Sequence, residues 1–130
     1  MQLQVISDLN LTTGDFSPVS YLNLTSKYLV VAGNIVSPIV SEEKRAQILD
    51  SFCSRIHFLF KKVFILLTKN DLSKEKINTF DEYSRMVNAV SKILYRYNNV
   101  KFLNGRSYCC EKFVITGGKF WENFETKTHK

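Results

Sequence analysis

Two uninterrupted apolar runs constrain the fold of this chain most strongly. Residues 28–32 (Tyr-Leu-Val-Val-Ala) and 63–67 (Val-Phe-Ile-Leu-Leu) contain no charged or strongly polar side chain. Such runs are typical of strands that are covered on both faces, as in a parallel sheet. Because parallel neighbours must be joined by long crossover connections, the runs predict an α/β fold.

Two helical patterns supply those connections. Ser41 can cap a first helix, and Thr79 with Glu82 forms a capping-box pattern before a second one. After each cap, apolar residues recur at intervals of three and four, as on one face of a helix. They are Ala46, Leu49, Cys53, Ile56 and Phe60 in the first helix, and Tyr83, Met86, Val87, Val90, Ile93, Leu94 and Tyr97 in the second.

Further short strands are expected near residues 3–6, 100–103, 108–110 and 113–116. The order of elements predicts one domain over residues 1–130. We expect an α/β domain with a single sheet, whose central strands are parallel and flanked by helices.

Composition limits the class of protein. Hydrophobic residues make up 45% of the chain and charged residues 23%, which is typical of a globular domain. No apolar run approaches the roughly 18 residues of a membrane span, and no secretory signal is visible, so we expect a soluble, intracellular protein. The abundance of Asn, Lys, Phe and Tyr is typical of AT-rich genomes and suggests a virus-encoded protein.

Sheets of this kind bind ligands beyond the carboxyl ends of their strands. Three polar segments follow the predicted strands at that edge, namely residues 8–10, 33–34 and 69–71. Any site is therefore expected where these segments meet.

The same segments resemble the motifs of the calcineurin-like metallophosphoesterases in order and spacing. Residues 5–10 (Val-Ile-Ser-Asp-Leu-Asn) are similar to the family's opening strand, which ends Ser-Asp-Leu-His. Residues 29–35 are similar to its Ala-Gly-Asp-Ile motif, and residues 65–71 to the strand that leads to Gly-Asn-His-Glu. Residues 100–104 and 114–121 resemble a later stretch of some bacterial and viral members, which ends Gly-Ala-Thr-Leu-Trp. The resemblance implies a truncated, degenerate member that corresponds to the N-terminal half of the family's sandwich.

The resemblance also implies the chemistry against which this chain must be compared. Active members use two divalent metals, bridged by the aspartate of the second motif, with Asp and His of the first motif and Asn of the third as further ligands. Later histidines complete the metal site, and the histidine of the third motif protonates the leaving group. Two such metals clamp the phosphate and generate a hydroxide at neutral pH.

This sequence departs from that ligand set. Asp8 and Asn70 are retained, but Asn10 replaces a histidine, Asn34 the bridging aspartate and Asp71 the catalytic histidine. A neutral amide cannot bridge two cations as a carboxylate does. An aspartate with an ordinary pKa near 3.9 would be ionised at pH 7 and unable to donate a proton. We therefore predict no catalytic residue and no cofactor; these five vestigial positions would hold at most one weak Mg²⁺, Mn²⁺ or Ca²⁺ ion.

Lys69 replaces a glycine of the third motif and brings an ammonium group to the same edge. We hypothesise that it replaces a metal by pairing with Asp8 or Asp71. Asn10 and Asn34 have a structural explanation as an alternative to metal binding, because asparagine tolerates the left-handed backbone of tight turns. Residues 70–71 could likewise form an Asx-type turn. The two histidines, His57 and His129, are not expected to be ligands.

A non-catalytic interaction or structural module on a degenerate metallophosphoesterase scaffold is the leading functional prediction. Without the second half of the family's fold, one sheet edge and part of one face would be bare, so we expect a homodimer or a protein partner. The aromatic residues Phe120, Trp121 and Phe124 are the candidate interaction residues.

Two alternative functions remain open. One is a residual metal-dependent phosphoesterase or phosphate binder. The other is nucleic-acid binding by the basic second half, in keeping with a net charge of +6. The cations concerned are Lys61, Lys62, Lys69, Lys74, Lys76, Arg85, Lys92, Arg96 and Lys101.

Overall fold

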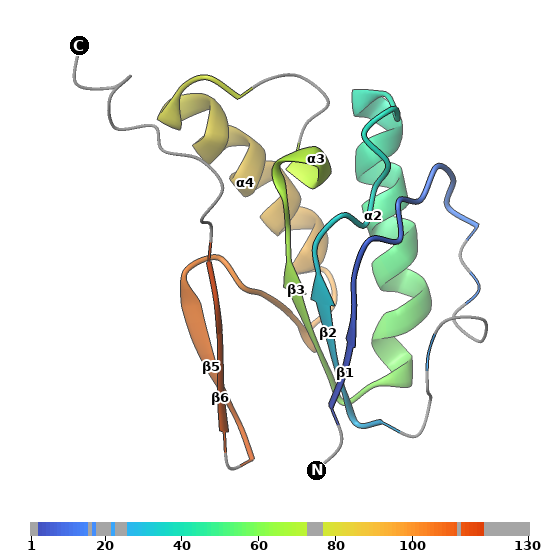
Figure 1. Cartoon of the computed structure of the whole chain (residues 1–130), viewed down its shortest axis with the longest axis vertical. Helices are drawn as coiled ribbons and strands as arrows, with labels where there is room; N and C mark the ends of the chain where they lie inside the picture. Colours follow the sequence, from blue (N-terminus) through green and yellow to red (C-terminus); the bar gives the residue numbers. More distant parts are fainter. Residues whose placement is uncertain are drawn as a thin grey trace.

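The computed structural model describes residues 3–15, 17, 22, 26–72, 77–111 and 113–118, except for the side chains of Asn70 and Phe113. The predicted interaction residues Phe120, Trp121 and Phe124 lie outside this range, as does His129. Within it the chain is an α/β protein with a four-stranded parallel sheet and a two-stranded hairpin (Figure 1).

The sheet has the strand order β1-β2-β3-β4, with β1 at Leu3–Ile6, β2 at Tyr28–Ala32, β3 at Lys62–Leu66 and β4 at Val100–Phe102. All neighbouring pairs are parallel, with Val5 beside Val30 and Val30 beside Phe64. The middle residues of β2 and β3 are apolar, in keeping with the fact that both strands contribute to a core on each face of the sheet. The predicted fold class is therefore confirmed.

Helices α2 (Glu42–Ile56) and α4 (Phe80–Leu94) cover one face of the sheet. The Ser41 hydroxyl accepts a hydrogen bond from the Lys44 amide at 3.4 Å, and the Thr79 hydroxyl accepts one from the Glu82 amide at 3.1 Å, so both predicted caps are confirmed. The helical patterns were expected to run as far as Phe60 and Tyr97. In the structure α2 ends at Ile56 and gives way to a short 3₁₀ turn, His57–Leu59, which brings the chain back to β3.

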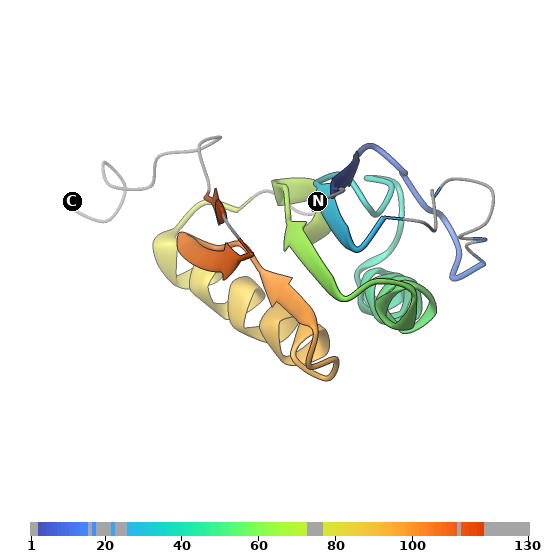
Figure 2. The same ribbon diagram turned by 90° about the horizontal axis from the view of Figure 1, so that it is seen from below.

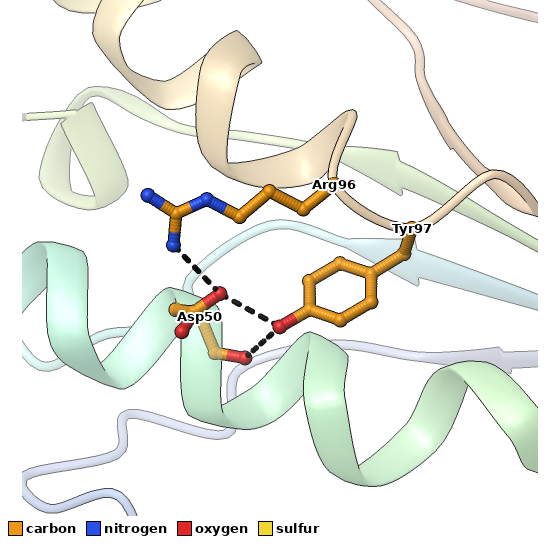
Figure 3. Close-up of polar contacts among 3 residues, drawn as sticks. All are labelled: Asp50, Arg96 and Tyr97. Atoms are coloured by element: carbon orange, nitrogen blue, oxygen red, sulfur yellow. Dashed lines mark hydrogen bonds and ion pairs between the residues drawn. The ribbon is translucent and has the colours of Figure 1, made fainter.

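Asp50, in the middle of α2, binds the two residues that follow the C-cap of α4 (Figure 3). Its carboxylate accepts a hydrogen bond of 2.7 Å from the Tyr97 hydroxyl and lies 3.2 Å from the Arg96 guanidinium. Burial, together with the hydrogen bond to Asp50, raises the pKa of Tyr97 to about 12. The hydroxyl therefore stays protonated, and remains a donor to Asp50, at any ordinary pH.

The hairpin of β5 (Arg106–Cys110) and β6 (Phe113–Gly117) lies on the side of the sheet away from α2 (Figure 1). It closes a second, smaller core that contains Tyr28, Phe64, Leu103 and Cys110. The hairpin does not cover β1, where Leu3 and Val5 remain 42% and 60% exposed. Among the described residues, β1 is thus an edge strand with part of its face exposed.

None of the helices in the described segments combines the length and apolar character that a bilayer crossing requires.

Candidate functional site

The carboxyl ends of β1, β2 and β3 meet, and the loops that follow β1 and β2 are joined through their backbones. The Asp8 amide donates to the Gly33 carbonyl at 3.1 Å, and the Asn10 amide donates to the Asn34 carbonyl at 3.0 Å. The structure thus brings the first two predicted segments side by side. This edge is also where parallel sheets place their ligands.

Left-handed backbone allows the loops to turn so tightly. Asp8, Asn10 and Asn34 have φ values of 57°, 48° and 55°, a region that asparagine and aspartate enter more readily than most residues. The predicted left-handed turns at Asn10 and Asn34 are therefore confirmed. Gly33 has φ 83°, and a Cβ at this position would lie 2.6 Å from the Thr68 Cγ2 atom, so both conformation and space call for glycine.

Asp71 lies in the middle of this edge and is fully buried, with an exposed fraction of 0%. Its Oδ1 atom accepts a hydrogen bond from the Val36 amide at 2.9 Å. Its Oδ2 atom accepts from the Asn34 amide at 2.9 Å and from the Thr68 amide at 3.1 Å. The Thr68 hydroxyl lies 3.2 Å from Oδ2 and 3.0 Å from the Asn34 side-chain oxygen, and its single hydrogen is shared between these two acceptors. One carboxylate thus ties the end of β3 to the loop that follows β2.

The local cause is the short helix α3 (Lys69–Leu72). Asp71 is its third residue and reaches back to the Thr68 amide, which is how an acidic residue acts in a capping box. The Asx-type turn expected at residues 70–71 involves the Asn70 side chain and Ser73, which lie outside the described part of the chain; the described Asp71 carboxylate accepts from an amide three residues earlier. The signal in the sequence was the Thr-x-x-Asp spacing from Thr68, a site residue that the sequence analysis missed.

The pKa of Asp71 also departs from the value assumed on sequence grounds. Burial raises the pKa above its usual range, although the hydrogen bonds from the Val36, Thr68 and Asn34 amides lower it in part. For function, the burial of the Asp71 side chain matters more than its raised pKa. A general acid must come within hydrogen-bonding distance of its substrate, and Asp71 has no exposed surface.

Asn34 links the buried and exposed parts of the site. Its side-chain NH₂ donates to the Asp8 carboxylate at 2.7 Å, and its side-chain oxygen accepts from the Thr68 hydroxyl at 3.0 Å. The Asp8 carboxylate also accepts from the Ser7 hydroxyl at 3.1 Å. We call Asp8, Asn34, Thr68 and Asp71 the strand-end cluster, because their hydrogen bonds join three strand ends.

The remaining predicted residues lie at the margin of this cluster. The Asn10 side chain donates to the main-chain carbonyl of Asp8, at 3.2 Å, rather than to its carboxylate. Asn70 lies in α3. In the described residues Lys69 forms no ion pair with Asp8 or Asp71, so the predicted replacement of a metal by its ammonium group is wrong. The physical reason is that the oxygens of Asp71 face inward to backbone amides.

The donor set does not fit a two-metal centre. Among the described residues, no three His, Cys, Asp or Glu side chains lie close enough together to hold a metal ion. At the position of the family's bridging carboxylate, Asn34 points N–H donors at Asp8. A cation between those two side chains would meet a repelling N–H group instead of a ligand oxygen.

A pocket of about 180 Å³ lies on the helix side of the cluster, between α2, α3 and α4. Its walls are mainly apolar, and it includes a buried arginine, Arg45, that donates to the Val40 carbonyl at 2.7 Å. Asp71 borders this pocket, but its two oxygens are engaged by the donors described above. The lining residues are Glu42, Arg45, Ala46, Leu49, Asp71, Leu72, Met86, Ala89, Val90 and Ile93.

No family model matches the sequence, and no curated protein matches it. Among solved structures, the chain is similar to the phosphopantetheinyl hydrolase PptH from Mycobacterium tuberculosis, with a TM-score of 0.47 and 22% sequence identity. The similarity covers 82% of this chain and 37% of that one, so this chain spans well under half the length of PptH.

Proposed function

We propose that this chain is a non-catalytic interaction or structural module on a metallophosphoesterase-like scaffold. The observation that supports the proposal best is the environment of Asp71. This residue stands where the resemblance places the catalytic histidine, yet it is fully buried and its carboxylate accepts hydrogen bonds from three backbone amides. A side chain held in this way stabilises loops and does not reach a substrate.

Asn34 supports the same reading. The amide joins the ends of β1 and β3 by giving its NH₂ group to Asp8 and its oxygen to Thr68. Each such hydrogen bond contributes about 1 kcal/mol, and bonds to a charged group contribute somewhat more. The strand-end cluster therefore replaces metal coordination with hydrogen bonds as the force that holds these loops.

The bare part of the sheet favours a role in binding other proteins. On β1, Leu3 and Val5 are exposed on the face that the hairpin leaves open, and β1 is an edge strand. Edges and apolar patches of this kind pair readily with other chains unless charges or bulges protect them. The described residues of β1 carry no charge. We therefore propose a second copy or another protein as the partner of this face.

Hydrolysis of a generic phosphodiester, such as bis-p-nitrophenyl phosphate, tests the non-catalytic role. We expect no turnover with Mn²⁺, Mg²⁺ or Ca²⁺, and no rise in thermal unfolding temperature when these ions are added. A metal-dependent activity that disappears in Asp8→Ala would contradict the proposal and favour a residual phosphoesterase.

A pair of valines tests the interaction role. Val5 on β1 and Val114 on β6 are exposed to nearly the same extent, at 60% and 59%. We expect Val5→Lys to abolish self-association or partner binding in light scattering, and Val114→Lys to leave it unchanged. A wild-type protein that is monomeric and recruits no partner through this face would contradict the assignment.

A further inference from the structure

The opposite end of the sheet has a different character. Strands β1 to β4 begin there, and α2 and α4 end there, as Figure 2 shows from below. Three short segments lie side by side at this amino end. The Lys61 amide donates to the Lys27 carbonyl at 2.8 Å, and the Asn99 side chain donates to the Phe60 carbonyl at 3.0 Å.

Cationic side chains gather on these segments. Residues 26–27, 54–62 and 95–101 contain no aspartate or glutamate. Of the acidic groups nearby, Asp15 and Asp50 are paired with Arg55 and Arg96, at 3.6 and 3.2 Å, and Glu111 of the hairpin lies beside Tyr28. The cations of the amino end are Lys27, Arg55, Lys61, Lys62, Arg96 and Lys101.

Four of these cations have no carboxylate partner within 4.0 Å among the described residues, namely Lys27, Lys61, Lys62 and Lys101. The negative ends of the two helix dipoles account for Arg55 in the last turn of α2 and Lys92 in the last turn of α4. The helix dipoles do not account for Lys27, which precedes β2, or for Lys61, which precedes β3. The excess of positive charge on the strand side thus has no partner within the described protein.

Exposed aromatic rings accompany this charge. Phe58 is 70% exposed and Tyr95 is 49% exposed, although both are large side chains that could have been buried. Phe58 lies in the same segment as Lys61 and Lys62, and Tyr95 in the same segment as Lys101. The His57 and Tyr97 rings, 4.8 Å apart, bring these two segments together. Lysines around exposed aromatic rings form the surface on which unpaired bases stack while their phosphates are neutralised.

We infer that the amino end of the sheet binds single-stranded nucleic acid through Lys27, Lys61, Lys62, Lys101, Phe58 and Tyr95. A single strand fits better than a duplex, because only unpaired bases offer their faces to the exposed rings. The inference rests on the proposed function, in which the chain acts by binding. It names one class of partner, on a surface separate from the bare face of β1.

Fluorescence anisotropy with a labelled oligo-U of about 20 nucleotides tests the inference at low salt. Four lysines that neutralise phosphates of a single strand predict a log–log salt slope of about −3. Duplex of the same length should bind more weakly. The inference is overturned if no binding is seen at about 50 mM salt, or if duplex binds as tightly.

Matched variants locate the surface. The double variant Lys27→Glu/Lys61→Glu should weaken binding about tenfold or more, because it removes two cations and adds two repelling charges. Lys44→Glu/Arg106→Glu makes the same change in net charge at exposed positions away from the amino end, and should have less than about a twofold effect. Equal losses in the two variants would overturn the inference, because they would indicate net charge rather than this surface.

Aromatic variants and a competitor identify the ligand. Phe58→Ala should weaken binding about fivefold or more, whereas Phe80→Ala, at a 52% exposed ring that begins α4, should not. Polyglutamate should compete far less well than oligo-U. Equal competition, or no effect of Phe58→Ala, would overturn the inference in favour of an acidic protein partner. Circular dichroism confirms that each variant is folded, and phosphodiesterase assays separately test the proposed function.

Discussion

The two ends of the parallel sheet satisfy their polar side chains in opposite ways. At the carboxyl end, the polar side chains of the strand-end cluster are hydrogen-bonded to one another, and the buried Asp71 carboxylate accepts from backbone amides. At the amino end, lysines that have no carboxylate partner in the described residues lie on the same short segments as the exposed rings of Phe58 and Tyr95. Polar residues at the end of a strand therefore do not by themselves make a ligand site. They can bind a ligand only where hydrogen bonds and ion pairs within the protein leave them available.

At the carboxyl end, two positions differ in side-chain type from the motifs that they resemble. The resemblance places a bridging aspartate at position 34 and a histidine at position 71, whereas this chain has an amide at the first and a carboxylate at the second. The result is a pair of loops joined by hydrogen bonds that these two side chains make. The relationship to the metallophosphoesterases remains a prediction.

Removal of the Asp71 carboxylate should have the largest effect. Asp71→Ala leaves the amides of Asn34, Val36 and Thr68 without their acceptor, so we expect a loss of about 3 kcal/mol or more in the free energy of unfolding. Asp81→Ala, at an exposed first-turn position of α4, should cost under about 1 kcal/mol. Urea unfolding measures both, and equal small losses would show that the cluster does not hold the fold.

Asn34→Asp tests the carboxyl end of the sheet further, because it introduces the carboxylate that the resemblance implies at this position. Asn34→Asp replaces a donor 2.7 Å from the Asp8 carboxylate with a second negative charge, so we expect a loss of about 1–2 kcal/mol. Added Mn²⁺ should recover part of this loss, because two carboxylates now face one another.

Asn104→Asp is the matched control, because its side-chain oxygen accepts from the Tyr83 hydroxyl and an aspartate can still accept. Thermal unfolding with and without Mn²⁺ measures the difference. If Asn34→Asp were as stable as the wild type without metal, the amide bridge between Asn34 and Asp8 would be unimportant.

Tyr97→Phe tests the polar contact between the segment that follows α4 and the middle of α2. Loss of the hydrogen bond to Asp50 should cost about 1 kcal/mol. The raised pKa of Tyr97 sets the pH dependence, because the native state keeps a proton that the unfolded chain loses above pH 10.0. The stability from Tyr97 is thus fully present below pH 10.0 and is lost as the pH rises to about 12.

Absorbance titration at alkaline pH checks this assignment. Burial raises the pKa of Tyr28 to about 12 as well, and it also raises the pKa of Tyr83, so Tyr28, Tyr83 and Tyr97 should all titrate late in the wild type. Tyr97→Phe should remove one of them and flatten the loss of stability above pH 10.0. If the group lost in Tyr97→Phe had titrated near pH 10.0 instead, Tyr97 would not be held by Asp50.

Charge reversal at the amino end should have the smallest effect on stability. Lys27 and Lys61 are exposed and have no carboxylate partner in the described residues, so Lys27→Glu/Lys61→Glu should change the free energy of unfolding by under about 0.5 kcal/mol. Urea unfolding of this double variant and of Asp71→Ala compares the two losses in the free energy of unfolding directly. A large loss would mean that the amino end is a structural network like the carboxyl end.

The sequence allowed the fold to be predicted because its strongest signals are local. The apolar runs identified β2 and β3 as covered on both faces, and Ser41 and Thr79 marked the two helix starts. The helix ends were less clear, because Phe60 and Tyr97 continue the apolar spacing although the chain has already turned toward the next strand.

The site was predicted in position but not in chemistry. The three polar segments were expected at the carboxyl edge and meet there, and the left-handed turns at Asn10 and Asn34 followed from residue type. The inward direction of Asp71 depends on the short helix α3, whose single turn leaves almost no periodic signal. For the same reason Thr68 was missed and the pairing of Lys69 was wrong.

Anomalous diffraction from crystals grown with Mn²⁺ tests the central claim most directly, because it locates bound metal at the strand ends without reliance on activity. The hydrogen-bonded cluster predicts no manganese peak beside Asp8 and an intact contact between the Asn34 NH₂ group and the Asp8 carboxylate. Two manganese peaks that share a carboxylate, with Asp71 turned outward to them, would contradict it.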